Sequence, residues 1–118
     1  MYKELETSKR THMCGTLRSK NKGNYVTVAG WVQRRRDLGG LIFVNLRDRS
    51  GFVQVVFDKD VNPDAFKLAG NIRSEFVLLV SGIVSPREEG QSNENLPTGE
   101  IEIKAERLEI LNTSETPP

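Results

Sequence analysis

The segment that decides the fold is residues 41–57, LIFVNLRDRSGFVQVVF. Both of its ends are rich in β-branched and aromatic side chains, as is typical of β-strands. The residues between the two ends, Asp48 to Gly51, have the composition of a tight hairpin turn. The segment therefore predicts two antiparallel strands, 41–47 and 52–57, joined by a short connection.

The sequence on either side of this hairpin supplies the other elements. Residues 25–33, YVTVAGWVQ, are rich in β-branched and aromatic side chains and predict a preceding strand. Gly30 inside that strand indicates a bulge or a sharp bend, as a closing barrel needs. After the hairpin the apolar spacing becomes helical over 62–71, with an asparagine to cap the helix and a proline in its first turn. Strand character returns at 76–84, and again from residue 100 with breaks to 110.

Three strands, a helix and two strands form the order of an OB-fold, an all-β, five-stranded Greek-key barrel that binds oligonucleotides. A generic α+β sheet has the same number of elements, but the bend and the helix between strands three and four favour the barrel. We expect a polar N-terminal segment over 1–14, the barrel over 15–111 and a linker over 112–118.

The composition excludes several classes of protein. A length of 118 residues fits one domain, and the single cysteine rules out an internal disulfide. The polar N-terminus lacks a signal-peptide core and no segment is apolar enough to cross a bilayer, so we expect a cytoplasmic protein without membrane partners. One histidine, one cysteine, no phosphate-binding Gly-Lys-Ser/Thr loop and no metal-ligand spacing predict no catalytic residues, no metal site and no cofactor in this chain.

Charge is distributed unevenly along the chain. Residues 1–49 contain eleven Lys and Arg against four Asp and Glu, whereas residues 50–118 contain six against twelve, although the net charge is +1. Such asymmetry indicates a local basic face for an anionic partner. The alternative is that folding mixes the charges over the surface.

The alternation within the hairpin places candidate binding residues on one face. If the aliphatic residues at 42, 44 and 46 fill the barrel, Phe43 lies on the outer face, and the same parity places Gln54 there. An aromatic ring can stack on a base, and an amide can pair with a base edge. In an alternate register, Phe43 would be a core residue.

Charged residues add to the candidates. The run 34–36 is three arginines that end the first predicted strand, and guanidinium groups suit phosphate and base edges. A solvated charge run is the alternative. Glu100 and Glu102 share a face of the last predicted strand, either as solvent-side residues or as acceptors for the amino and imino groups of bases.

A longer segment carries a resemblance to a known family. Residues 30–57, GWVQRRRDLGGLIFVNLRDRSGFVQVVF, together with RTHMCG at 10–15 and TGEIEI at 98–103, closely resemble the N-terminal anticodon-binding domain of bacterial aspartyl-tRNA synthetases. The match covers residues 10–111. Related barrels occur in asparaginyl- and lysyl-tRNA synthetases, but the RRRDLGG run is more particular to the aspartyl branch.

This resemblance implies an OB-fold that recognises a G-U-C anticodon whose first base is often modified to queuosine. Phe43 would stack on an anticodon base, the central U, while Gln54 and Arg36 would contact base edges or phosphates. Glu102, with Glu100, would accept hydrogen bonds from a base. The implied tRNA-binding residues are Arg34, Arg36, Phe43, Gln54, Arg87, Gln91, Asn93, Glu100 and Glu102.

The resemblance also implies a longer parent enzyme. That enzyme would be a class II, homodimeric aspartate–tRNA ligase using ATP and Mg²⁺, its catalytic domain following the 112–118 linker, while the isolated domain would be a monomer without activity. Whether the parent charges only aspartate tRNA or also asparagine tRNA stays open, with Leu38 and the long loop near that choice. Two other functions also stay open: a free-standing single-strand-binding OB protein and a protein-interaction barrel.

Overall fold

The computed structural model describes residues 9–88 and 90–112. Two short 3-10 turns come first, followed by three strands, one helix and two strands. In chain order the elements are η1 (Cys14–Thr16), η2 (Ser19–Asn21), β1 (Tyr25–Asp37), β2 (Leu41–Asp48), β3 (Gly51–Asp58), α2 (Pro63–Ala69), β4 (Val77–Pro86) and β5 (Ile101–Asn112).

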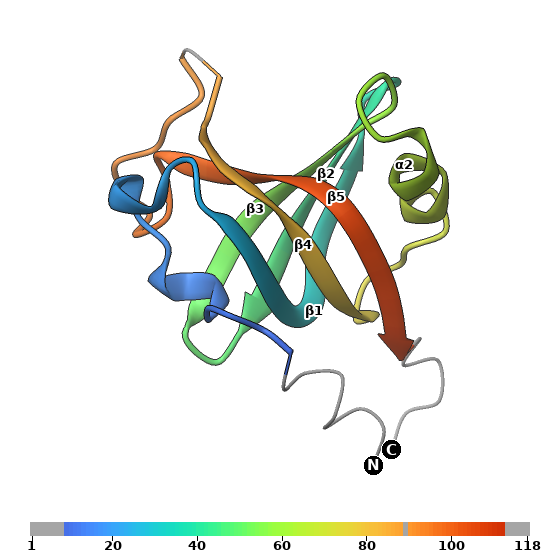
Figure 1. Cartoon of the computed structure of the whole chain (residues 1–118), viewed down its shortest axis with the longest axis horizontal. Coiled ribbons are helices and arrows are strands. Elements are labelled where there is room, and N and C mark those ends of the chain that lie inside the picture. Colours follow the sequence, from blue (N-terminus) through green and yellow to red (C-terminus); the bar gives the residue numbers. More distant parts are fainter. Residues whose placement is uncertain (1–8, 89, 113–118) are drawn as a thin grey trace.

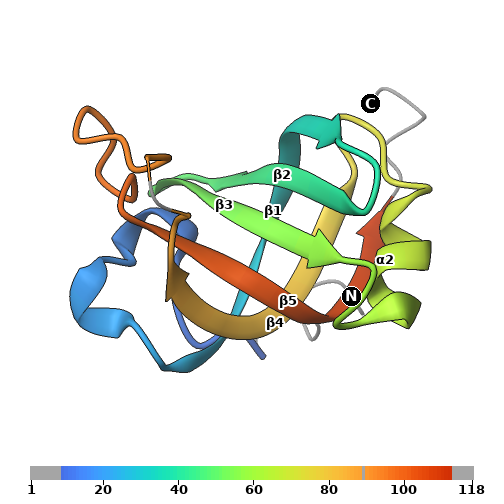
Figure 2. The ribbon, with the colours of Figure 1, turned by 90° about the horizontal axis from the view of Figure 1, so that it is seen from above.

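The five strands close into a barrel in the order β1-β2-β3-β5-β4 (Figure 1). Neighbouring strands are antiparallel except β3 and β5, which run parallel and share only the pairs Val55–Ile103 and Val56–Lys104. Helix α2 lies at one end of the barrel, and the 3-10 turns and the β4–β5 loop lie at the other (Figure 2). The predicted barrel, with its helix between the third and fourth strands, is confirmed.

The barrel interior is filled by one face of every strand. The residues at 42, 44 and 46 that were predicted to point inward from β2 are buried in the core cluster. Val53, Val55 and Phe57 of β3 are buried there as well. The aromatic ring of Phe43, by contrast, is only half-buried on the opposite face of β2. The register that places Phe43 outside is therefore correct, and the alternate register is wrong.

Strand β1 departs from the prediction in length and in the position of its bulge. It continues to Asp37, so the three arginines lie within the strand and do not open a loop. The register shifts between Val32 and Arg34, not at Gly30. Gly30 lies where β1 exchanges β4 for β2 as its partner, and a Cβ there would collide with the carbonyl oxygen of Arg47. The glycine therefore allows two backbones to pass closely.

Other boundaries differ by a few residues. Helix α2 is shorter than the predicted 62–71 because the chain turns at Gly70. The packed part of the chain already includes Cys14, which is fully buried and whose backbone N–H donates to Asp48 Oδ2 over 2.7 Å. Most of the expected polar segment (1–8) and of the expected linker (113–118) lies outside the described residues. Within the described ranges, no helix is long and apolar enough to span a bilayer.

Candidate nucleic-acid interface

The bulge in β1 determines which arginines face the candidate site. After the bulge, Arg34 pairs with Asn45 and Arg36 pairs with Phe43, so both arginines share the outer face of the sheet with these residues. Arg35 pairs with Val44 and points to the other side, where its guanidinium lies 3.5 Å from Asp37 and from the carbonyl oxygen of Ala69. A β-bulge re-aims the side chains that follow it.

Phe43 and Arg36 form one unit on this face. The guanidinium carbon of Arg36 lies 5.1 Å from the centroid of the Phe43 ring, within the range of a cation–π contact. Arg36 itself is exposed and Phe43 is half-buried. The ring is therefore held by a cationic neighbour while part of its surface stays accessible for stacking.

Gln54 and Glu102 form a second unit. Gln54 Nε2 donates a 2.8 Å hydrogen bond to Glu102 Oε1, and both side chains are largely buried, with 8% and 4% of their surfaces exposed. The buried amide therefore has a partner on β5. Burial raises the pKa of Glu102, as does the charge of Glu88, while the Gln54 bond and the cations Lys104 and Arg87 oppose the rise.

Arg87 brings a further cation to the same face from the start of the β4–β5 loop. Its Nε donates to the carbonyl oxygen of Ile101 over 3.1 Å, which fixes the side chain. Burial lowers the pKa of Arg87; the charge of Glu102 opposes this effect and the charge of Arg36 adds to it. An arginine stays protonated at neutral pH despite such a shift, so the loop contributes a fixed positive charge.

These side chains line two adjoining pockets. The first, of about 110 Å³, is lined by Arg34, Arg36, Phe43, Asn45, Phe52, Gln54, Arg87 and Leu96. The second, of about 310 Å³, is lined by Arg36, Leu38, Phe43, Gln54, Glu88, Gln91 and Glu102. Seven of the nine predicted site residues are thus brought together around Phe43 and Gln54.

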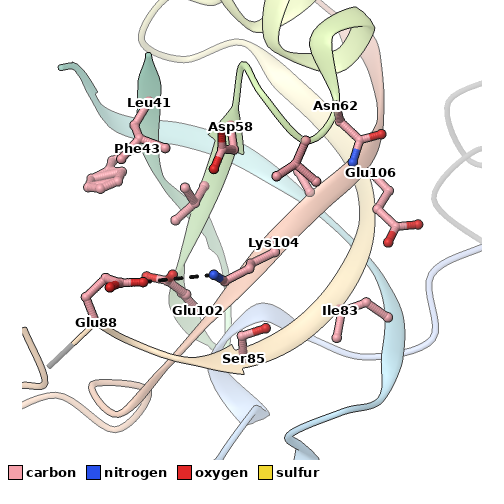
Figure 3. Close-up of a pocket in the computed structure, with 13 residues that line it drawn as sticks. Leu41, Phe43, Asp58, Asn62, Ile83, Ser85, Glu88, Glu102, Lys104 and Glu106 are labelled. Carbon is pink, nitrogen blue, oxygen red and sulfur yellow. Dashed lines mark ion pairs between the residues drawn. The ribbon is translucent and has the colours of Figure 1, made fainter. Parts of the chain in front are cut away.

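A larger pocket of about 450 Å³ continues from this site across β3 (Figure 3). Leu41 and Phe43 lie on one side of it, and Glu88, Glu102 and Lys104 lie together on the other. Lys104 Nζ and Glu88 Oε2 are 4.0 Å apart. Aliphatic and acidic residues both line this pocket. It shares Phe43 with both adjoining pockets, and Glu88 and Glu102 with the second of them.

The two remaining predicted residues lie elsewhere. Glu100 precedes β5, and its carboxylate accepts a 2.6 Å hydrogen bond from Ser19 Oγ. Asn93 lies within the long loop, where its Oδ1 accepts from the backbone N–H of Asn95 over 2.9 Å. Neither residue lines the pockets around Phe43 and Gln54.

Asn45, Phe52 and Leu96 line the first pocket but were not among the predicted site residues. The alternation of the hairpin strands is sufficient to place Asn45 and Phe52 on the outer face with Phe43. Leu96 has no such signal, because it lies in an irregular loop whose path the sequence pattern does not specify.

Comparison with known proteins assigns this chain to a family. A family model described as an OB-fold nucleic acid binding domain matches residues 26–111. Over 118 residues the chain is 55% identical to the aspartate–tRNA(Asp/Asn) ligase of Halothermothrix orenii, covering all of this chain and 20% of that protein. It is 55% identical over 109 residues to the Bacillus subtilis protein of the same name, covering 92% of this chain and 18% of that protein. The chain thus spans about a fifth of the length of these curated relatives.

Solved structures agree with the sequence relatives. Asparaginyl-tRNA synthetase from Pyrococcus horikoshii is similar with a TM-score of 0.73 and 30% identity, covering 89% of this chain and 23% of that one. An OBody bound to hen egg-white lysozyme is similar with a TM-score of 0.77 and 30% identity, covering 89% of this chain and 95% of that one. Strand order, surface chemistry and a family match over most of the chain agree: the chain belongs to the family of OB-fold nucleic acid binding domains.

Proposed function

We propose that this chain binds the anticodon loop of a tRNA through the outer face of β1, β2 and β3 and the adjoining Glu102, as the recognition module of an aspartate–tRNA ligase. The observation that carries the proposal is the convergence of a stacking ring, a hydrogen-bonding pair and three arginines on two adjoining pockets. The similarity of the chain to aspartate–tRNA(Asp/Asn) ligases supports the identity of the parent enzyme.

The chemistry of the site favours a single strand with exposed bases. Phe43 offers a stacking surface that every base can use, and stacking on an aromatic ring contributes about 1–3 kcal/mol per base. Gln54 and Glu102 together offer amide and carboxylate groups for a base edge, which only an unpaired base can present. Arg34, Arg36 and Arg87 supply positive charge for the phosphates.

The roles within the site follow the family resemblance. Phe43 stacks on the central U of a G-U-C anticodon, and Gln54 and Arg36 contact neighbouring base edges or phosphates. Glu102 accepts hydrogen bonds from an amino or imino group of a base. Of the three anticodon bases, only G and C carry an amino group. Gln91 lines the second pocket and contacts the anticodon loop of the RNA from there. Glu100 and Asn93 contact the RNA only if the protein loop between β4 and β5 changes its conformation.

The activity of the parent enzyme is part of the same proposal. Full-length aspartate–tRNA ligase would attach aspartate to its tRNA with ATP and Mg²⁺, in the cytoplasm and as a homodimer, while this domain by itself would be monomeric. Within residues 9–88 and 90–112, no three His, Cys, Asp or Glu residues are grouped to hold a metal ion. We assign this chain's residues to RNA binding.

Filter binding of the chain to an anticodon stem-loop of aspartate tRNA tests the proposal. We expect binding that falls steeply with salt, because phosphate contacts release counterions, and that weakens when the anticodon bases are exchanged. Equal binding of every loop sequence would identify a general single-strand-binding protein instead. Absence of any salt-dependent binding would refute a role in RNA recognition.

A further inference from the structure

We propose that Arg47 and Phe52 form a second stacking platform, which binds one further nucleotide of the same RNA strand beyond the bases held at Phe43 and Gln54. This inference rests on the proposed function. It extends the interface along β2 and β3 toward their hairpin turn, into a pocket that the anticodon site does not use.

The second platform repeats the geometry of the first. Arg47 and Phe52 are directly paired across β2 and β3, on the same face as the paired residues Asn45 and Gln54. The guanidinium carbon of Arg47 lies 5.3 Å from the centroid of the Phe52 ring, against 5.1 Å for Arg36 and Phe43. Phe43 and Arg47 are four positions apart on β2, which corresponds to about 13 Å along a strand. A single strand crossing Gln54 therefore reaches both rings.

Phe52 connects two cavities. It lines the 110 Å³ pocket that contains Phe43 and Gln54, and also a separate pocket of about 180 Å³ near the hairpin turn. The other residues lining that second cavity are Gly15, Arg47, Ser50, Gly51, Pro97 and Thr98. The half-buried ring of Phe52 therefore borders open space on the side away from the anticodon site.

Arg47 differs from Arg87 in how the protein holds it. The Nε of Arg87 donates to a backbone carbonyl, whereas the Nε of Arg47 is buried and has no hydrogen-bond partner among the residues that the structure describes. A buried donor on a charged group is costly when it is left unpaired. An acceptor on a ligand, such as a phosphate oxygen, would remove that cost after a small rotation of the side chain.

These features specify what the platform binds. The Phe52 ring stacks on a base without selecting its identity, because every base has a π-face, and the Arg47 guanidinium pairs with a phosphate oxygen. The platform therefore contributes affinity for a nucleotide next to the recognised bases and little sequence preference at that position.

The experiment combines protein variants with RNA variants in fluorescence anisotropy measurements on an anticodon stem-loop. Phe52→Leu keeps an apolar side chain and removes the ring, and Phe52→Tyr keeps the ring. Leu68→Ala is a control on α2, at a residue that lines none of these pockets. The RNA set replaces each loop nucleotide that flanks the anticodon, one at a time, by an abasic residue. Thermal unfolding confirms that each variant is folded at the temperature of the binding assay.

We expect Phe52→Leu to weaken binding of the intact loop on the order of 5- to 100-fold, and Phe52→Tyr and Leu68→Ala to leave it within about two-fold of the unmodified protein. One abasic loop should lose a similar factor, and Phe52→Leu should have no further effect on that loop, because both changes remove the same contact. Arg47→Gln should lower the slope of log affinity against log salt concentration by about one unit, which corresponds to the loss of one phosphate contact.

Two results would overturn the platform while leaving the proposed function intact. Either Phe52→Leu binds the intact loop as well as the unmodified protein, or its effect is the same on every abasic loop, while Phe43→Ala still weakens binding. If the unmodified protein does not bind the stem-loop, the proposed function fails, and the second platform fails with it.

Discussion

Gln54 of β3 and Glu102 of β5 are joined by a 2.8 Å hydrogen bond although 48 positions separate them in the sequence. The bond leaves the second N–H and the carbonyl oxygen of Gln54, and the second carboxylate oxygen of Glu102, available to a base edge. The two side chains therefore act as one recognition element. Substitutions at both positions should be non-additive in RNA binding.

Glu102→Gln should stabilise the domain at neutral pH. Burial raises the pKa of Glu102, so the folded protein favours the protonated form, and the stability that this carboxyl contributes is lost as the pH rises through its folded-state pKa. A glutamine can still accept from Gln54 and carries no charge. Thermal unfolding from pH 4 to 8 should show a higher Tm for the variant at pH 7, with an advantage that shrinks as the pH falls through the folded-state pKa and is absent below the ordinary glutamate pKa of 4.5. A lower Tm at pH 7 would contradict this account.

Phe43→Ala should weaken binding of the anticodon stem-loop by about 1–3 kcal/mol, because it removes a stacking surface. The domain should remain folded, since Phe43 lies outside the barrel and only partly buried. Circular dichroism melting is the control, because truncation of a core phenylalanine would cost about 3–5 kcal/mol of folding free energy. A folded variant that binds the stem-loop normally would show that the stacking assignment is wrong.

Arg36→Ala and Arg35→Ala should differ although the two arginines are adjacent. Arg36 faces the candidate site, whereas Arg35 faces the end of α2, with its NH2 group 3.4 Å from the carbonyl oxygen of Gly70. Only Arg36→Ala should weaken RNA binding and lower the slope of log affinity against log salt by about one unit. The measurement is a salt titration of stem-loop binding by both variants. Equal slopes for the two variants would contradict the assignment of Arg36 to the RNA-binding face and of Arg35 to the opposite face.

Asp48→Asn should destabilise the domain by about 1–3 kcal/mol at pH 7, because buried donors lose a charged acceptor. Burial raises the pKa of Asp48, whereas hydrogen bonds from the Ser50 hydroxyl and from the N–H groups of Cys14 and Ser50 lower it. The hydrogen bonds together outweigh burial, so the net shift of the pKa is downward. The stability from this carboxylate is present above its unfolded-state pKa and is lost as the pH falls through the folded-state value.

Urea unfolding of both proteins across pH 2 to 7 checks this prediction. The difference in unfolding free energy between the unmodified protein and Asp48→Asn should be largest near neutrality and should shrink in acid. A difference that grows in acid would contradict the role of Asp48 in holding η1 against the β2–β3 turn.

The sequence was sufficient for the order of strands and helix along the chain and for the face of the hairpin on which Phe43 and Gln54 lie, because both depend on local patterns of side chains. It did not locate the β1 bulge, because a glycine is only one of several causes of irregular pairing. Family resemblance, not periodicity, selected Arg34 and Arg36 over Arg35. The contact between Gln54 and Glu102 could not be predicted from local sequence patterns either, because it depends on the pairing of β5 with β3 that closes the barrel.

The barrel closes through the pairing of β3 with β5, although this pairing is short. These two strands share two backbone residue pairs, and Gln54 and Glu102 add a side-chain link between them. A base that bonds to both side chains would connect the two strands through the ligand. Binding and the cohesion of this junction are then thermodynamically coupled, so that strengthening either one strengthens the other by the same free energy. The same two residues would thus serve as an element of architecture in the free domain and as an element of specificity in the complex.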